Sequence, residues 1–196
     1  MARISLNSLS KLTWKMHSYS DFGLVIKRHN LGEADKLVTL YTKEHGKITL
    51  KAKGVRKLTS KRAGSIDLFN YIKFHAVSGR GEIDILTEVE NISDFSAWKV
   101  HLGRVNIAYQ LCELVDKLTP DRQPHAEIFE ILLSCLQAIS KLGSDWELQI
   151  SNFKFQILTE LGYWNADQKY EGDVNDLVES VSERPLHAHK ILRMLK

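Results

Sequence analysis

The sequence predicts an α+β protein in which a small β-barrel is followed by an all-helical domain. Three observations lead to this prediction. Apolar and polar residues alternate with a period of two from residue 21 to about residue 90, and apolar residues recur at helical spacing after that. The charge also changes sign: residues 1–80 carry a net charge of +11 and residues 81–196 a net charge of −8, within a total of only +3.

Residues 1–20 form a basic leader with five serines, three strong bases and no acidic residue. This composition is compatible with a transit peptide, but the segment lacks an Arg-rich face and a cleavage site. It also lacks the apolar core of a secretory signal. We therefore expect a flexible basic arm or an upstream start codon here.

Residues 21–93 are predicted to form the barrel. "FGLVIKRH" is a first strand, and "DKLVTLYTKEHGKITLKAKG" is a hairpin that turns at His45 and Gly46. "FNYIKFHAVS" and "EIDILTEVE" form another strand pair, joined by the turn Gly79-Arg80-Gly81. Five strands in so short a segment suit a small closed barrel, and an SH3-like barrel fits the strand count nearly as well.

Residues 94–196 are predicted to form the helical domain. "AWKVHLGRVNIAYQLCELVDKL", "HAEIFEILLSCLQAI" and "WELQISNFKFQILTELG" have helical spacing, and Gly162 is a natural stop. Residues 163–176 are polar and predict a loop, after which "LVESV" and a helix over "PLHAHKILRMLK" close the chain. No low-complexity linker separates the two parts, so we expect them to pack directly together.

The two cysteines, Cys112 and Cys135, lie in separate apolar segments, which predicts buried thiols in a reducing, cytoplasmic compartment. No apolar run approaches the ~18 residues of a membrane span, so we expect a soluble protein.

No catalytic motif stands out. The chain has neither a P-loop nor a Gly-x-Ser-x-Gly elbow, and the only closely spaced histidines, His187 and His189, are more simply explained as exposed residues of a terminal helix. We therefore expect no enzyme and no cofactor. One enzymatic alternative stays open, a metal-dependent nuclease that uses Glu82, Asp84 or Glu88.

A basic surface is the strongest functional signal. "KGVRKLTSKRAG", residues 53–64, holds five cations and no acidic residue, and it follows a strand whose lysines share one face. We predict a surface that binds nucleic-acid phosphates without sequence preference, made of Lys27, Arg28, Lys47, Lys51, Lys53, Arg56, Lys57, Lys61 and Arg62. Tyr71 and His75 could stack on unpaired bases, although Tyr71 fits the core equally well.

The order of several segments resembles the bacterial recombination mediator family RecO. "GLVIKRHNLGEADKLVTLYTKEHGKITLKAKGVRK", the Gly-Arg-Gly hairpin, "DILTEVE", "FKFQILTELGY" and "HAHKILRMLK" carry this resemblance. It implies an OB-fold followed by a helical domain, and a protein that binds single- and double-stranded DNA and anneals complementary strands. It also implies two partners, RecR and the single-strand-binding protein SSB, with which the family helps to load recombinase.

The resemblance assigns DNA contacts to basic residues of the barrel, which match Lys51, Lys53, Arg56, Lys57, Lys61 and Arg62 best. It places the acidic SSB tail on the helical domain, where Arg104 and Lys154 are candidate contacts. Many relatives insert a four-cysteine zinc element after "LGY", but "WNADQKYEGDVND" has no cysteine, so we predict no zinc. A competing hypothesis is an RNA-binding OB protein of translation or RNA processing.

Overall fold

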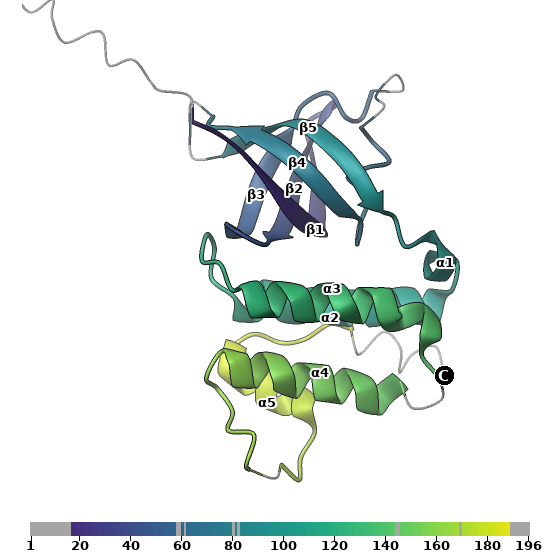
Figure 1. Cartoon of the computed structure of the whole chain (residues 1–196), viewed down its shortest axis with the longest axis vertical. Helices are drawn as coiled ribbons and strands as arrows, with labels where there is room; N and C mark the ends of the chain where they lie inside the picture. Colours follow the sequence, from purple (N-terminus) through teal and green to yellow (C-terminus); the bar gives the residue numbers. More distant parts are fainter. Residues whose placement is uncertain are drawn as a thin grey trace, which may run out of the picture.

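A β-barrel packs on two layers of helices in the computed structural model, which describes residues 17–57, 60, 62–79, 81, 83–143, 146–168 and 170–188. Figure 1 shows α2 and α3 directly beneath the barrel and α4 and α5 beneath them. The strands are β1 Ser18–Leu31, β2 Asp35–Thr42, β3 Gly46–Ala52, β4 Tyr71–Val77 and β5 Asp84–Ser93. The helices are α1 Ser96–Lys99, α2 Leu102–Leu118, α3 Ala126–Ala138, the short 3₁₀ helix η2 Ile139–Lys141, α4 Trp146–Glu160 and α5 Val174–Ser182.

The barrel closes in the order β1-β2-β3-β5-β4. All neighbouring strands are antiparallel except β3 and β5, which pair in parallel at only two positions, Leu50 with Asp84 and Lys51 with Ile85. A five-stranded closed barrel of this kind is OB-like, which confirms the predicted fold class and decides against the SH3-like alternative.

The first strand is longer than predicted and serves two cores. β1 begins at Ser18, and a bulge at Ile26 interrupts its pairing with β2. Val25 points into the barrel, whereas Leu24 and Ile26 belong to the core shared with the helices. The alternation of side chains along β1 thus lets one strand contribute to both sides of the barrel wall.

Two helical predictions were wrong in part. The helix predicted over 97–118 is divided near Val100 and His101 into α1 and α2. The helix predicted over 185–196 does not begin at Pro185, because residues 185–187 are not helical and the carboxylate of Glu113 accepts the backbone N–H groups of His187 and Ala188. The remainder of that prediction, residues 189–196, lies outside the described residues.

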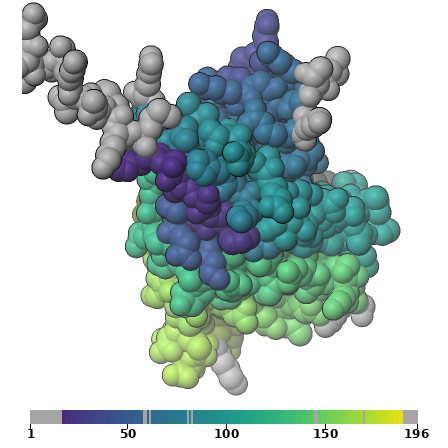
Figure 2. Space-filling view, turned by 45° about the horizontal axis from the view of Figure 1, so that its top comes forward, coloured from purple at the N-terminus to yellow at the C-terminus, as the bar shows by residue number. Residues whose placement is uncertain are grey.

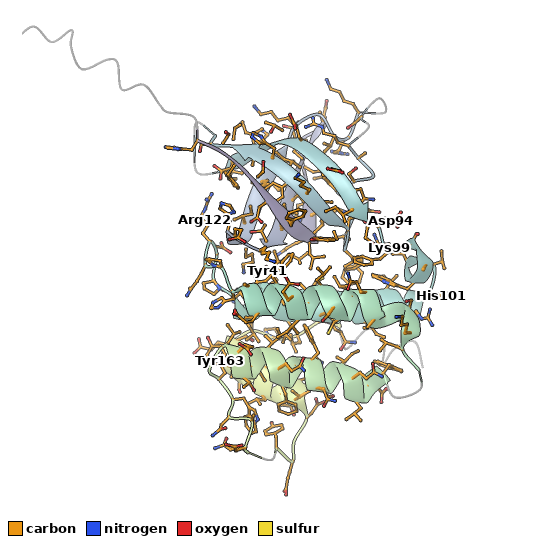
Figure 3. The ribbon with its side chains drawn as sticks, viewed as in Figure 1. Tyr41, Asp94, Lys99, His101, Arg122 and Tyr163 are labelled. Atoms are coloured by element: carbon orange, nitrogen blue, oxygen red, sulfur yellow. The ribbon has the colours of Figure 1, made fainter. Side chains whose placement is uncertain are left out.

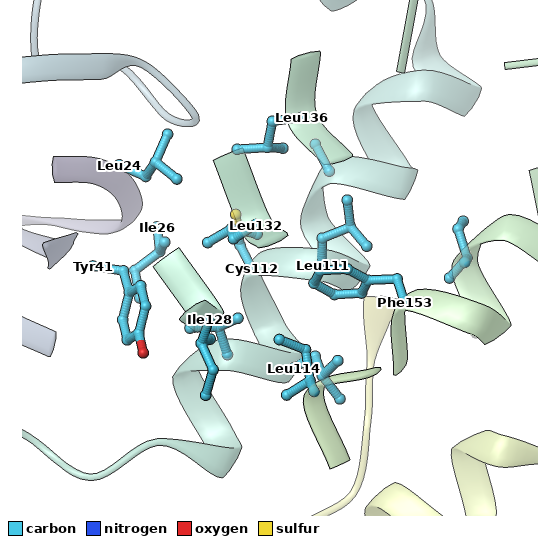
Figure 4. Close-up of a cluster of buried hydrophobic side chains, with 14 of the residues drawn as sticks. Leu24, Ile26, Tyr41, Leu111, Cys112, Leu114, Ile128, Leu132, Leu136 and Phe153 are labelled. Carbon is cyan, nitrogen blue, oxygen red and sulfur yellow. The ribbon is translucent and has the colours of Figure 1, made fainter. Parts of the chain in front are cut away.

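Barrel and helices share one hydrophobic core, as expected from the missing linker. Leu24, Ile26 and Tyr41 of the barrel face Ile128 and Leu132 of α3 (Figure 4). All five side chains are buried. Burial of this much apolar surface is the main favourable term in joining the two parts.

The loop between α2 and α3 also fixes the barrel. Its Asp121 forms a parallel bridge with Lys47 of β3, and the N–H of Arg122 donates to the Lys47 carbonyl at 2.9 Å. Gly46, at φ +67°, lies so close to this loop that an added Cβ would meet the Gln123 carbonyl oxygen at 2.2 Å. A glycine is needed at this turn both for its backbone angle and for space.

A pair of glycine substitutions should separate these two requirements. Gly46→Ala should destabilise the protein by ~3 kcal/mol or more, because it adds a clash with Gln123 to the strain of a positive φ. Gly32→Ala is the matched control, since Gly32 has φ +60° but nothing within 4 Å, and it should cost only about 1 kcal/mol. Urea unfolding measures both, and equal losses would contradict the close approach.

Candidate nucleic-acid interface

The loop that leaves β3 is held in a defined position by Asp35 at the start of β2. The Asp35 carboxylate accepts the N–H of Gly54 at 2.8 Å and the ammonium of Lys51 at 3.1 Å. The Gly54 hydrogen bond and then Lys51 keep the pKa of Asp35 below its usual value. Arg56 adds a backbone hydrogen bond to Ala34 at 3.0 Å, so the basic loop follows the β1–β2 hairpin closely.

Three cations of this loop face solvent. Lys53, Arg56 and Lys57 are exposed, and the Arg56 guanidinium donates to the Gly32 carbonyl. Within the described residues, the ammonium groups of Lys53 and Lys57 have no hydrogen-bond or ion-pair partner. Figure 2 shows blue barrel segments at the top of the view, at the end opposite the green and yellow helices, and other blue segments that reach the helices.

Arg62 has a structural role that the sequence did not indicate. Its guanidinium donates to the carbonyls of Thr87 at 3.0 Å, Leu86 at 3.3 Å and Lys53 at 2.9 Å. These bonds bridge the sides of the short parallel seam between β3 and β5. Its charge still adds to the local potential, but most of its donors are already used. Lys61, predicted beside it, lies outside the described residues.

A second group of cations lies at the mouth of the barrel, the end where β1 stops and β2 begins. Arg28 forms an ion pair with Asp67. Lys36 has a pKa below its usual value, first because of burial and then because the positive charges of Arg28 and Arg56 lie near it. Lys36 was not among the residues predicted from the sequence, although the register that pairs it with Ala52 places it beside the basic loop. We call Arg28, Lys36, Lys51, Lys53, Arg56 and Lys57 the mouth cluster.

Lys27 and Lys47 do not belong to this cluster, contrary to prediction. Both pair with Asp116 of α2, at 3.3 and 3.4 Å, and the ammonium of Lys47 also donates to the Asp116 carbonyl at 2.5 Å. Lys47 is only 8% exposed and has a further ion pair with Asp121 at 3.4 Å. The helical domain covers this end of β3, so the predicted row of lysines is divided between the mouth and the domain interface.

The predicted stacking residues are also engaged. Tyr71 packs against Phe22 and against Phe129 of α3, with ring centroids 6.1 and 6.2 Å apart, and burial raises its pKa. Tyr71 is thus partly buried against the core, which favours the core alternative. His75 contacts the Thr87 hydroxyl at 2.9 Å and lies opposite Glu88, on a face whose acidic residues would repel a nucleic-acid backbone.

Asp84 and Glu88, the two described carboxylates considered for a nuclease, have different surroundings. Asp84 is 7% exposed, and its carboxylate accepts the Tyr19 hydroxyl at 2.9 Å and pairs with Arg122 at 3.1 Å, which anchors the α2–α3 loop. Figure 3 labels Arg122 beside the barrel. Glu88 is exposed, and Glu82 lies outside the described residues. In the described part of the chain, no three His, Cys, Asp or Glu side chains are arranged to hold a metal ion.

The two residues proposed for a partner's tail have different surroundings. Arg104 lines an open pocket of about 440 Å³ at the start of α2, together with His101, Ile107, Leu142 and Trp146. Lys154 is only 4% exposed, and its ammonium contacts the side-chain oxygens of Gln110 at 3.4 Å and Asn175 at 2.5 Å. Burial leaves Lys154 no surface to offer a partner, so we remove it from the candidate contacts.

Within the described residues, no helix combines the length and apolar character needed to cross a membrane.

Comparisons with known proteins cover most of the chain. Residues 16–95 match the family model described as Recombination protein O N terminal, and residues 101–184 match Recombination protein O C terminal. The chain is 34% identical over 148 residues to the DNA repair protein RecO of Pelotomaculum thermopropionicum. The aligned segment covers 76% of the chain and 57% of the relative. The corresponding protein of Symbiobacterium thermophilum is also 34% identical over 148 residues, 76% of the chain and 58% of the relative. The chain thus spans less than three fifths of these two relatives.

Lys154 gives a prediction about pH. Burial lowers its pKa to about 8, although the nearby carboxylates of Asp173 and Glu113 oppose this shift. Between pH 8 and 10.5 the unfolded chain holds a proton that the folded chain has lost, so stability should rise with pH in this window. The free energy of unfolding, relative to that of Lys154→Met, should increase by roughly 2 kcal/mol from pH 7 to pH 10.

Guanidinium unfolding of both proteins across this range is the measurement. Lys141→Met, which changes an exposed lysine, serves as the control and should show no such increase. A constant difference between the natural protein and Lys154→Met would mean that Lys154 keeps an ordinary pKa.

Proposed function

The chain belongs to the RecO family of recombination proteins, and from this premise we propose that it binds DNA through the mouth cluster and anneals complementary strands without catalysing a reaction. The proposal concerns single- and double-stranded DNA bound without sequence preference. It is supported mainly by one observation: the mouth cluster contains like charges that are near one another and only partly neutralised.

The electrostatics of the cluster favour a polyanion. Burial lowers the pKa of Lys36 most, the positive charges of Arg28 and Arg56 lower it further, and Asp67 opposes the shift. Among the described residues of the cluster, Lys51 pairs with Asp35 and Arg28 pairs with Asp67. A phosphate chain at the mouth would relieve this repulsion and release its own condensed counterions. Contacts with backbone phosphates fix position without reading sequence, which suits a protein that must act on any damaged site.

The mouth cluster would also promote the annealing of two strands. Two complementary strands repel each other, and a cationic surface offsets that repulsion for phosphates within about 10 Å of it, the distance beyond which 0.1 M salt screens charges from one another. Contacts that involve phosphates leave the base edges free to pair. Tyr71 packs against Phe129 and His75 contacts Thr87, so neither ring is free to hold a base. This agrees with the proposal, because bases stacked on aromatic rings would have to be released before they could pair.

The triple variant Lys53→Ala/Arg56→Ala/Lys57→Ala tests the proposal. We expect weaker binding to a fluorescent single-stranded oligonucleotide, and a plot of log affinity against log salt that is less steep by about two units. Strand annealing should slow in parallel. Fluorescence anisotropy across a salt series and a two-strand quenching assay measure these effects.

A matched control removes the same charge elsewhere. Lys73→Ala/Lys141→Ala/Arg184→Ala also takes three cations from exposed positions, and its salt dependence should stay near that of the natural protein. Equal losses in both variants would mean that overall charge, and not the mouth cluster, decides binding. Tighter binding to RNA than to DNA of the same sequence would favour the RNA-binding alternative.

We further propose that the pocket at the start of α2 receives the acidic, apolar tail of SSB. Its lining is mostly apolar, with Trp146 and Leu142, and Arg104 supplies a positive charge. The first turn of α2 carries no acidic residue and its N-cap His101 makes no side-chain capping bond, so free N–H groups favour a carboxylate nearby. Arg104→Glu should weaken binding of an SSB tail peptide at least tenfold.

Isothermal titration with that peptide measures this effect, and Lys141→Glu is the charge-matched control. Unchanged affinity in Arg104→Glu would place the tail elsewhere. Action together with RecR is proposed from family membership alone. A purified RecR that shows no association by analytical ultracentrifugation would remove it from the proposal.

A further inference from the structure

A second pocket lies at the end of the molecule farthest from the barrel. It has a volume of about 630 Å³ and lies between α4 and the loop that follows it. Figure 1 shows this loop below the helices, with α2 and α3 between it and the barrel. Neither DNA binding nor the proposed tail contact uses this pocket.

Three aromatic rings line one side of it. Phe155 comes from α4, and Trp164 and Tyr170 come from the loop. Trp164 and Tyr170 stand nearly perpendicular, at 83° with centroids 5.5 Å apart, and Phe155 lies 5.7 Å from Trp164 and 6.2 Å from Tyr170. Packing among the rings stabilises the loop, but the rings do not fill the space beside them.

The rest of the lining is polar and anionic. Glu160 borders the pocket together with the amide side chains of Asn152, Gln156 and Gln168. The loop adds Asp167 and Glu171, both exposed. Among the described residues that line the pocket, Glu160 is the one charged side chain, so this surface has the opposite sign to the mouth cluster.

We propose that this pocket binds a cationic side chain of a partner protein, an arginine in a basic, extended segment. The negative faces of aromatic rings attract cations, and a planar guanidinium can stack on a ring while it donates to a carboxylate. Glu160 is the carboxylate in position to accept it. A phosphate ligand would be repelled by the same group, which excludes the DNA backbone from this site.

Neutral ligands would bind this pocket less tightly than a cation, because they leave the charge of Glu160 without a partner. An apolar side chain that filled the pocket would remove water from Glu160 without giving it a partner, which is unfavourable for a charged group. A neutral amide could bond to Asn152 or Gln156 but would gain nothing from the surrounding carboxylates. Charge complementarity therefore selects a cation.

The test uses the full chain labelled with 5-fluorotryptophan and two probe peptides, acetyl-Gly-Arg-Gly-amide and the same tripeptide with citrulline in place of arginine. We expect the arginine peptide to shift the fluorine resonance of Trp164 saturably, with a dissociation constant of order 1 mM. Trp164→Phe identifies that resonance. The resonance of buried Trp98 should not move, and the neutral citrulline peptide should have little effect.

Glu160→Gln should weaken the arginine peptide about fivefold or more, while Glu90→Gln, an equal charge change on exposed β5, should leave it unchanged. Unaltered resonances of the other tryptophans in Glu160→Gln show that the variant is folded. Equal shifts with the citrulline peptide, or no saturable shift at about 20 mM peptide, would overturn the proposal. Neither result bears on DNA binding, which both glutamate variants should retain.

Discussion

The arrangement of the whole molecule depends on one buried ammonium group, that of Lys47, held between the barrel and α2. It contacts the carboxylates of Asp116 and Asp121 and the Asp116 carbonyl, while only 8% of the residue is exposed. A buried charge that loses its partners is strongly unfavourable. Any sliding of α2 along the barrel would separate Lys47 from Asp116 and would therefore cost free energy. Apolar packing around Tyr41 and Leu24 supplies the attraction between the domains but is less directional. The ion pairs and the close approach of Gly46 to Gln123 then select one orientation.

This orientation determines which surfaces remain available for ligands. At the end of the barrel that carries Lys27 and Lys47, the helical domain buries Lys47, which pairs with Asp116 and Asp121, and Lys27 pairs with Asp116 while it stays exposed. The opposite end stays open and keeps Lys53, Arg56 and Lys57 in solvent. The division of charge along the sequence thus becomes a division in space, with the positive mouth at one end and the acidic loop of the helical domain at the other (Figure 1).

Much of the fold could be predicted from local pattern, and the limits of that prediction have a physical cause. Alternation of apolar and polar residues located all five strands and the turn at Gly46, since each depends on neighbours in sequence. Alternation also put Lys47 and Lys51 on one face correctly, but it carries no information about what covers that face. Asp116, which lies 69 residues further along the chain, decides the role of Lys47. The contact between Lys36 and Arg56 likewise depends on how the strands pair, which local pattern does not determine. The hydrogen bonds from Arg62 to Leu86 and Thr87 form only once the barrel has closed.

The cations at and near the mouth of the barrel differ in their contacts with the protein. Some are needed to hold the barrel together, and others are left to bind a ligand. Arg62 satisfies backbone carbonyls across the parallel seam, where only two residue pairs join β3 to β5, so its position follows from the needs of the barrel. No comparable need explains Lys36, whose charged form is disfavoured by burial and by its cationic neighbours. A fold under selection for stability alone would gain from a neutral residue there, because repulsion between like charges lowers the free energy of unfolding. Positive charge at a position where burial opposes it fits the proposed polyanion ligand, whose phosphates would add counter-charge to that of Asp35 and Asp67.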